Sequence, residues 1–245
     1  ATSVLFGVAL GFKFQAIFLS PYIMYLILRR EMSPFHLLVV PAVYALMMVP
    51  AWLAGRDAWD LLTISLSQGA TYHRLSMNAP NMWYVLQRLS FVSYKAGVVA
   101  GLIGTVAAFS WFLCRIYPVD PEVPPTEMKI LVAVFSVLLA PYLIPKMHDR
   151  YFFAADVFSL LFLFLGFRLK LVPLLVQLGS LFAYVVWLTQ SPDGSGRIFQ
   201  YVYFFRGQTV IGSVLMTVAI WLVGRTLFRL IERHREGFPA VRSSG

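Results

Sequence analysis

Apolar runs, separated by short polar segments, follow one another along the whole chain. A hydrocarbon core of roughly 30 Å needs about 20 apolar helical residues. Every backbone N–H and C=O there must bond within the protein, so only helices or closed barrels can cross it. Apolar runs occupy these segments: Val4–Phe12, Ala16–Leu28, Phe35–Leu53, Lys95–Arg115, Met128–Ile144, Phe152–Phe167, Leu171–Leu188 and Thr209–Gly224. The sequence therefore predicts an all-α, polytopic transmembrane helical bundle of about seven to eight membrane helices, with residues 1–245 as one transmembrane domain.

Composition favours a membrane protein over a soluble enzyme. Of the 245 residues, 59% are hydrophobic and 13% are charged, with a mean hydropathy of +0.74, whereas soluble domains are about a quarter charged. The net charge of +9 would suggest nucleic acid for a soluble protein, but here membrane topology and an anionic ligand explain it. The single cysteine, Cys114, excludes an internal disulfide and a multi-cysteine metal site. We expect no metal, no cofactor and no nucleic-acid partner.

Basic residues indicate how the helices are oriented. Positively charged groups are expected at the cytoplasmic ends of membrane helices, and these residues fit: Arg29, Arg30, Arg115, Lys129, Arg168, Lys170 and the cytoplasmic basic tail, residues 225–245. Residues 55–94 are then an outer-face loop, in which Trp59, Leu62 and Leu66 share one face of a helix lying on the membrane surface. The outer face still carries more arginine and lysine than an anchoring role requires, which an anion site there would explain.

The segment PKMHDRYFF, Pro145–Phe153, places four polar side chains between two apolar runs. Such groups cost several kcal/mol at membrane depth unless they reach water or a partner. Lys146 and Arg150 supply fixed positive charge for an anion, and His148 can donate a hydrogen bond. We therefore expect this segment to bind a phosphate at a membrane face. The alternative is interfacial anchoring, with Asp149 pairing a neighbour.

Lys13 and Gln15 interrupt the first apolar stretch. Either one long helix carries Lys13 inside the bundle, or two helices meet at Lys13, and we favour two helices. A lysine between apolar runs is a costly placement. Contact with a phosphate or a sugar would explain these residues, and so would an anchor at a helix end.

The segment YHRLSMNAPNMW, Tyr72–Trp83, combines amides, aromatic rings and basic groups. Asn78 and Asn81 can hydrogen-bond sugar hydroxyls, and Trp83 can stack on a sugar face, while His73 and Arg74 can reach a phosphate. The alternative is turn chemistry around the proline, with aromatic anchors at the membrane interface.

Three segments together resemble one family. PKMHDRYFF resembles the "PKMHERYFFP" signature of bacterial and archaeal integral membrane mannosyltransferases similar to GPI mannosyltransferase II, within the GT-C glycosyltransferase superfamily. GFKFQA, Gly11–Ala16, is similar to the family's "GLALLxKxQAxxxxP" stretch, and LSMNAPNMW to its "LSxNAPNLW" loop. Asp149 stands where glutamate is usual, which shortens the reach of the carboxylate, and Ala154 stands where proline is usual, which removes a helix-start signal.

The resemblance implies transfer of a sugar, mannose by family, from a polyprenyl- or dolichyl-phosphate donor to a glycan, lipid or protein acceptor at the outer or lumenal face. Chemistry and resemblance together assign the donor phosphate to Lys146, His148, Arg150, Arg74 and Lys13. They assign the sugar or acceptor to Gln15, His73, Asn78, Asn81, Trp83, Asp149 and Tyr151. The resemblance also predicts a prokaryotic plasma-membrane protein in preference to one of the endoplasmic reticulum.

The catalytic acid of such enzymes usually lies in the first outer loop. The chain is expected to begin beyond that loop, as the C-terminal, donor-binding part of a larger enzyme. Asp57 and Asp60 are the best carboxylates left to act as a general base, although a helix cap is the expected role of Asp57.

A second hypothesis of another class stays open. It is a non-enzymatic membrane transporter or scaffold for an anionic lipid or solute. Transporters often carry broken helices in two corresponding halves, whereas this sequence shows one break, at Lys13, and no inverted repeat.

Overall fold

The computed structural model describes residues 1–63, 73–117, 125–164, 169–188 and 207–235. Helices dominate these residues, and the prediction of an all-α bundle is confirmed apart from two strands of two residues each. The elements follow in this order: α1 (Thr2–Phe12), η1 (Phe14–Leu19), α2 (Ser20–Leu28), η2 (Pro34–Leu38), α3 (Val39–Leu53), β1 (Ser76–Met77), α5 (Met82–Arg88), α6 (Tyr94–Ile116), α7 (Pro125–Leu143), β2 (Met147–His148), η3 (Asp149–Phe152), α8 (Phe153–Ser159), α9 (Leu161–Phe164), α10 (Leu171–Leu188) and α11 (Gln208–Arg235).

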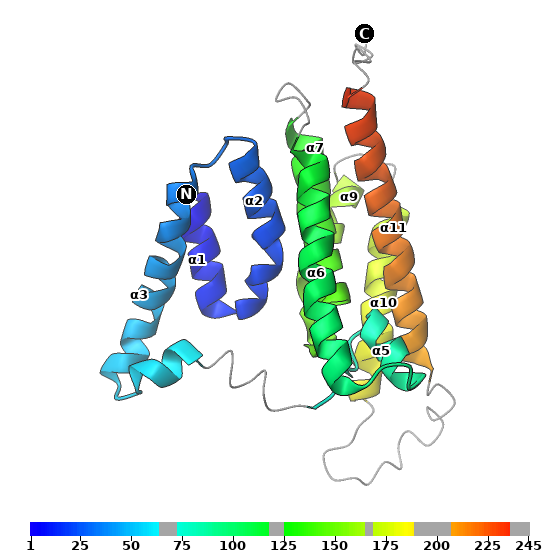
Figure 1. Ribbon diagram of the computed structural model, residues 1–245, viewed down its shortest axis with the longest axis horizontal. Coiled ribbons are helices and arrows are strands. Elements are labelled where there is room, and N and C mark those ends of the chain that lie inside the picture. Colours follow the sequence, from blue (N-terminus) through cyan, green and yellow to red (C-terminus); the bar gives the residue numbers. More distant parts are fainter. Residues whose placement is uncertain (64–72, 118–124, 165–168, 189–206, 236–245) are drawn as a thin grey trace.

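The helices run back and forth between the two ends of the molecule (Figure 1). α1 ends at Lys13, where the backbone is extended, and η1 and α2 return beside it. The turn after α1 therefore lies toward the end of the molecule where α5 is labelled in Figure 1; this end also holds the paired strands β1 and β2, and we call it the motif end. Arg29 and Arg115, predicted to share a face, follow α2 and close α6 at the opposite end. The predicted helix break at Lys13 is confirmed.

Four helices of the described residues are long and apolar enough to cross a membrane: Pro34–Leu53, Tyr94–Ile116, Thr126–Leu143 and Gln208–Arg233. This is compatible with a membrane protein, but the predicted count of seven to eight spans is not confirmed. α1, with 11 residues, reaches only about 16 Å at 1.5 Å per residue. The run predicted from Phe152 to Phe167 divides into η3, α8 and α9 as far as Phe164, where the described part of that segment ends.

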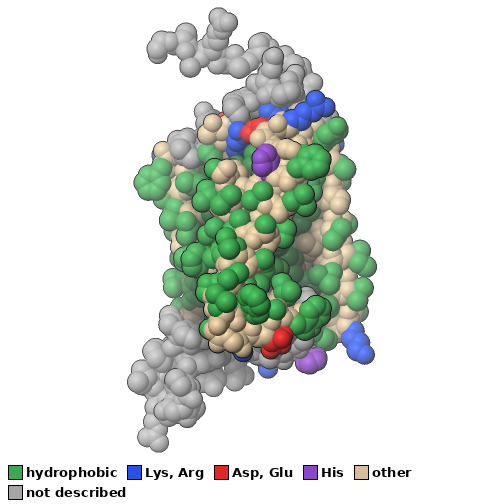
Figure 2. All heavy atoms as spheres, turned by 90° about the vertical axis from the view of Figure 1, so that its left-hand side faces the viewer, with side chains coloured by type: hydrophobic (Ala, Val, Ile, Leu, Met, Phe, Trp, Pro, Cys, Tyr) green, Lys and Arg blue, Asp and Glu red, His purple; other side chains and the backbone are tan. Residues whose placement is uncertain are grey.

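α1 and α3 form a pair on one side of the molecule. Gly7 and Gly11 lie directly against Val43 and Met47 of α3, where a larger side chain would collide. No residue in the apolar window of Pro34–Leu53 is buried. Figure 2 shows this side covered by hydrophobic side chains, with charged groups and histidines gathered at its two ends. Such a face suits hydrocarbon, because large exposed apolar patches are rare on proteins surrounded by water.

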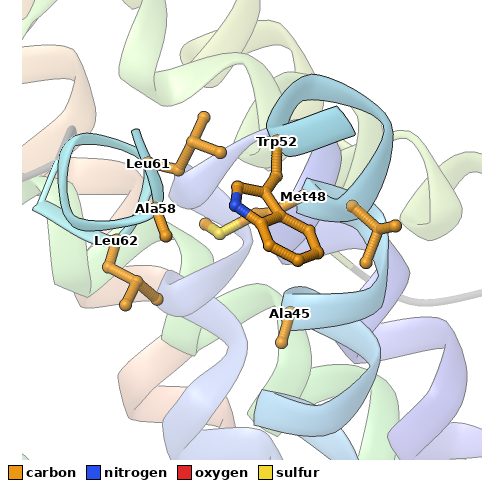
Figure 3. Close-up of a pocket in the computed structure, with 7 residues that line it drawn as sticks. Ala45, Met48, Trp52, Ala58, Leu61 and Leu62 are labelled. Atoms are coloured by element: carbon orange, nitrogen blue, oxygen red, sulfur yellow. The ribbon is translucent and has the colours of Figure 1, made fainter. Parts of the chain in front are cut away.

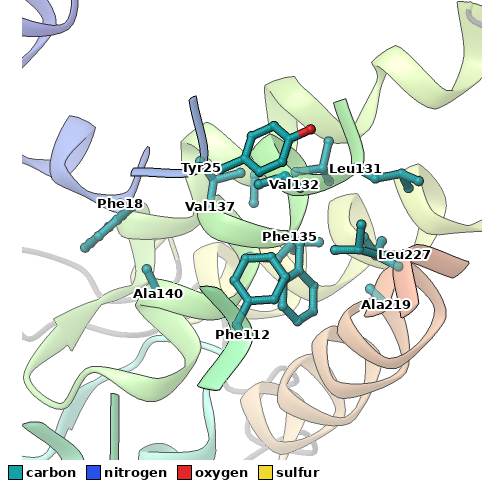
Figure 4. Close-up of a cluster of buried hydrophobic side chains, with 14 of the residues drawn as sticks. Phe18, Tyr25, Phe112, Leu131, Val132, Phe135, Val137, Ala140, Ala219 and Leu227 are labelled. Atoms are coloured by element: carbon teal, nitrogen blue, oxygen red, sulfur yellow. The ribbon is translucent and has the colours of Figure 1, made fainter. Parts of the chain in front are cut away.

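α7 is the central helix of the bundle, with 61% of its apolar window buried against 22% for α6. Its Phe135 packs against two aromatic rings. The Phe135 ring centroid lies 5.0 Å from that of Phe112 of α6 (Figure 4) and 6.4 Å from that of Phe228 of α11. α2 also packs on α7, and an ion pair between Glu31 and Lys129 joins them at the end opposite the motif end.

We expect Phe135→Ala to lower the free energy of unfolding by roughly 3 kcal/mol, because it opens a cavity where three helices meet. Phe135 is 6% exposed, whereas Phe164 on α9 is 82% exposed, so Phe164→Ala is the matched control and should change stability little. Denaturant unfolding in detergent micelles measures both variants. A Phe135→Ala protein as stable as the wild type would contradict the central role of this contact.

Candidate anion-binding site

Two loops far apart in the sequence pair through their backbones at the motif end. β1 and β2 form a parallel two-stranded sheet in which Ser76 faces Met147 and Met77 faces His148. The Lys146 N–H donates to the Leu75 carbonyl at 2.7 Å, just before the paired residues. The structure thus joins the two segments, LSMNAPNMW and PKMHDRYFF, that carry most of the family resemblance. Neither segment has the alternating pattern that predicts a strand.

Asn81 and Trp83 fasten the first loop to the end of α7. Asn81 is fully buried, its Oδ1 accepts from the Tyr84 N–H at 3.0 Å as the cap of α5, and its Nδ2 donates to the Pro141 carbonyl at 3.2 Å. The Trp83 indole N–H donates to the Leu143 carbonyl. These polar groups therefore hold the loop in place. A contact of either residue with a sugar stays a prediction.

Asn78 links the same loop to two further helices. Its Nδ2 donates to the Ala183 carbonyl of α10 at 2.6 Å, and its Oδ1 accepts from the Thr209 hydroxyl of α11 at 2.7 Å. Asn78 has a φ of 63°, a left-handed conformation that asparagine tolerates better than most residues. Its predicted contact with a sugar also stays a prediction.

Gln87 is a positioning residue that the sequence analysis did not identify. Its Oε1 accepts from the backbone N–H groups of Leu75 and Ser76, at 2.7 and 3.2 Å. It thereby satisfies two backbone donors at the start of β1. A lone glutamine on a short helix gives no sequence signal of this role.

Basic side chains gather around Tyr94, the first residue of α6. The Lys146 Nζ lies 5.6 Å from the centre of the Tyr94 ring, and the His73 ring centroid lies 5.6 Å from it. Arg74 follows His73 and is exposed. Lys146 has a φ of 64°, which is rare for a residue with a long side chain and marks local strain. The fold holds this lysine in an unfavourable backbone conformation.

A second group of basic and aromatic side chains surrounds η3 and the start of α8. The Lys13 Nζ lies 5.8 Å from the centre of the Phe153 ring. The Tyr151 ring contacts Phe18 of η1, at 6.3 Å between centroids, and His148, at 5.4 Å. Gln15, two residues after Lys13 on η1, is half-buried. The structure therefore brings the predicted Lys13 segment against PKMHDRYFF.

Charge at this site is predominantly positive. Burial and the nearby Arg150 guanidinium lower the pKa of His148 below its ordinary value of 6.5, while Asp149 acts in the opposite direction. His148 is therefore neutral at pH 7 and can donate a hydrogen bond. The Asp149 carboxylate accepts from the Arg150 N–H at 2.8 Å, and the Arg150 side chain is exposed.

Asp57 caps a helix, as expected. Its Oδ1 accepts from the N–H groups of Trp59 and Asp60, at 2.8 and 3.1 Å, at the start of the helical residues 58–63. Between this helix and α3 lies a cavity of about 190 Å³ with only apolar side chains around it, including Trp52, Met48 and Leu61 (Figure 3). Among the described residues, no ion pair joins Asp57 or Asp60 to Lys13, Lys146 or Arg150. Leu66 lies outside the described residues.

No family model, curated protein or solved structure matches this chain. The family resemblance therefore rests on the three motifs themselves. Within the ranges that the structure describes, no group of three or more His, Cys, Asp or Glu side chains could hold a metal ion.

We expect Asn81→Ala to destabilise the folded protein by about 2 kcal/mol, because the buried Pro141 carbonyl and Tyr84 N–H lose their partners. Asn81→Asp is the matched variant: it keeps the acceptor for Tyr84 but places an unpaired carboxylate against the buried Pro141 carbonyl, so it should be at least as destabilising as alanine. Thermal unfolding of the three proteins tests this order. Equal stability of Asn81→Ala and the wild type would show that these bonds do not hold the loop.

The lowered pKa of His148 predicts a pH dependence of stability. The unfolded chain takes up a proton near pH 6.5, and the folded protein resists it, so stability should fall as the pH drops below about 6.5. Melting temperatures between pH 5 and 8 measure the slope. His148→Gln should flatten it, whereas His36→Gln, at an exposed site on η2, should leave it unchanged. An identical slope in His148→Gln would refute this assignment.

Proposed function

We propose that this protein is a glycosyltransferase of the GT-C superfamily that moves a sugar, mannose by family resemblance, from a polyprenyl- or dolichyl-phosphate donor to an acceptor. The site at the motif end binds the donor phosphate. That end faces the outside of a prokaryotic cell, so transfer takes place on the extracytoplasmic side of the membrane.

The observation that carries this proposal is the meeting of three motif segments at one end of an apolar bundle. Lys13 contacts Phe153, and Lys146 is bonded through its N–H to Leu75. Three parts of the chain separated by some tens of residues thus contribute basic residues to the two neighbouring groups, around Tyr94 and around η3, that make up the site. An interfacial anchoring role for each segment alone would not require that they contact one another.

The chemistry of the cluster suits a leaving phosphate. When the acceptor hydroxyl attacks the anomeric carbon, the bond from that carbon to the phosphate oxygen breaks, and negative charge builds up on the lipid phosphate. Lys13, Lys146 and Arg150 carry fixed positive charge that stabilises it, and neutral His148 donates a hydrogen bond. Preorganised donors stabilise such charge best, and the Lys146 backbone is held by its hydrogen bond to Leu75 beside the paired strands.

The surroundings of the cluster suit a lipid-linked donor. α8 leads away from Phe153 toward the opposite end, and its large side chains Phe153 and Val157 are exposed, as is Phe164 beyond them on α9. A prenyl chain whose phosphate lies beside Lys13 can therefore lie along apolar side chains. Asp149, Tyr151 and Gln15 supply polar atoms for the sugar or the acceptor.

We expect Arg150→Ala in the full-length protein to lower transfer about a hundredfold, the loss typical of removing one charge-stabilising donor from an active site. The assay places the protein in lipid vesicles with labelled polyprenyl-phosphate-mannose and a mixed acceptor extract. Arg88→Ala, which removes an exposed cation from the last turn of α5, is the matched control and should transfer like the wild type.

Two results would decide against the proposal. If Arg150→Ala transfers the sugar as well as the wild type does, the basic residues of the site do not bind the donor phosphate. Label that stays on the carrier across a range of acceptors and donor sugars, while Arg150→Ala loses binding of the carrier, would favour the transporter or scaffold for an anionic lipid.

A further inference from the structure

A carboxyl group lies buried behind the motif end. Asp156 in the first turn of α8 is 8% exposed. Its Oδ1 accepts a hydrogen bond from the Ser180 hydroxyl of α10 at 2.6 Å, and the Tyr184 hydroxyl also bonds to its carboxyl group. The Gln177 amide donates to the Asp156 backbone carbonyl at 2.9 Å. Residues 177, 180 and 184 share one face of α10, so Asp156 is hydrogen-bonded along that face.

Hydroxyl groups, and not cations, satisfy this carboxyl group. No lysine, arginine or histidine nitrogen of the described ranges lies within ion-pair distance of it. A charged carboxylate buried without a cation is expensive, so its role depends on hydrogen bonds. The titratable or charged groups on the elements packed against α8 are Asp149, Arg150 and Tyr151 of η3, Tyr184 of α10, and Glu127, Lys129 and Tyr142 of α7.

The same turn of α10 reaches the site. Ala183 accepts from Asn78 in the first loop, and the next residue, Tyr184, bonds to Asp156. On α8, Asp156 comes one turn after Phe153, and the Lys13 Nζ lies 5.8 Å from the centre of the Phe153 ring. Movement of α8 along α10 would therefore displace η3, Phe153 and the paired strands together.

We propose that Asp156, Ser180 and Tyr184 form a polar latch between α8 and α10, and that Asp156 is a positioning residue for the anion site. The latch fixes the start of α8, and with it η3, against the turn of α10 that holds Asn78. Because the latch works through hydrogen bonds, an uncharged amide should replace the carboxyl group. The proposal rests on the proposed function for its binding assay alone.

The binding assay uses the full-length protein in lipid nanodiscs with a fluorescent short-chain polyprenyl phosphate. Asp156→Ala should weaken binding about tenfold, because it removes the buried hydrogen bonds to Ser180 and Tyr184, whereas Asp156→Asn, which can keep them, should stay within about threefold of the wild type. Ser180→Ala should weaken binding alone but add nothing in the Asp156→Ala background, because both remove the same bond. Ser136→Ala, a buried serine of α7 that bonds within its own helix, should bind like the wild type.

A spin label at position 153 gives a second measurement that needs no ligand. In a Cys114→Ser background, Phe153→Cys provides the labelling site. Asp156→Ala should raise the mobility of this label, and Asp156→Asn should not. Wild-type mobility in Asp156→Ala, or full additivity with Ser180→Ala, would overturn the latch. Equal losses of binding in Asp156→Asn and Asp156→Ala would show that the charge or a proton matters, which would also overturn it.

Failure of the proposed function has a different signature. If the wild type does not bind the polyprenyl phosphate, the function is wrong, and the spin label alone then decides on the latch. If the wild type binds the probe and Asp156→Ala binds equally well with an immobile label, the function stands and the latch is wrong.

Discussion

Backbone pairing between β1 and β2 is the interaction on which the motif end depends. Through it the Lys146 N–H bonds to Leu75, and the lysine stays in a left-handed conformation with its ammonium group beside Tyr94. Asn78, next to β1 in the same loop, hydrogen-bonds to α10 and α11. Two short loops thus become one rigid surface, although an isolated pair of two-residue strands would be unstable in water. Helices on several sides supply the stability that the strands lack.

The apolar surroundings of the bundle explain why the buried polar residues near this surface hydrogen-bond to other groups of the chain. Backbone groups in apolar surroundings must find partners within the chain. Asn81 supplies a hydrogen-bond donor to the Pro141 carbonyl, in the last turn of α7. Asp156 and its hydroxyl partners satisfy one another between α8 and α10. The positive side chains, by contrast, lie at the end of the bundle, where a phosphate or water can reach them.

Much of the helical arrangement could be predicted, because hydropathy and helix-ending signals are local. The break at Lys13 and the cap by Asp57 follow from residues within a few positions. The division of the run after Phe152 into η3, α8 and α9 could not be predicted, since an apolar run gives the same signal whether its helix is continuous or broken. The two strands likewise leave no pattern in the sequence. The motifs indicated Lys146, His148 and Arg150, but not Gln87, Tyr94 or the latch around Asp156.

The sequence by itself determined that the chain forms an apolar helical bundle with excess positive charge in three segments, because composition and charge require no knowledge of contacts. Only the tertiary structure decided that these segments meet, and that Asn81 and Trp83 point to α7. The physical reason is that hydrogen-bond partners are chosen among groups that the fold brings together. Asn78 and Thr209 lie far apart in the chain, and only the packing of α11 beside the first loop makes them partners.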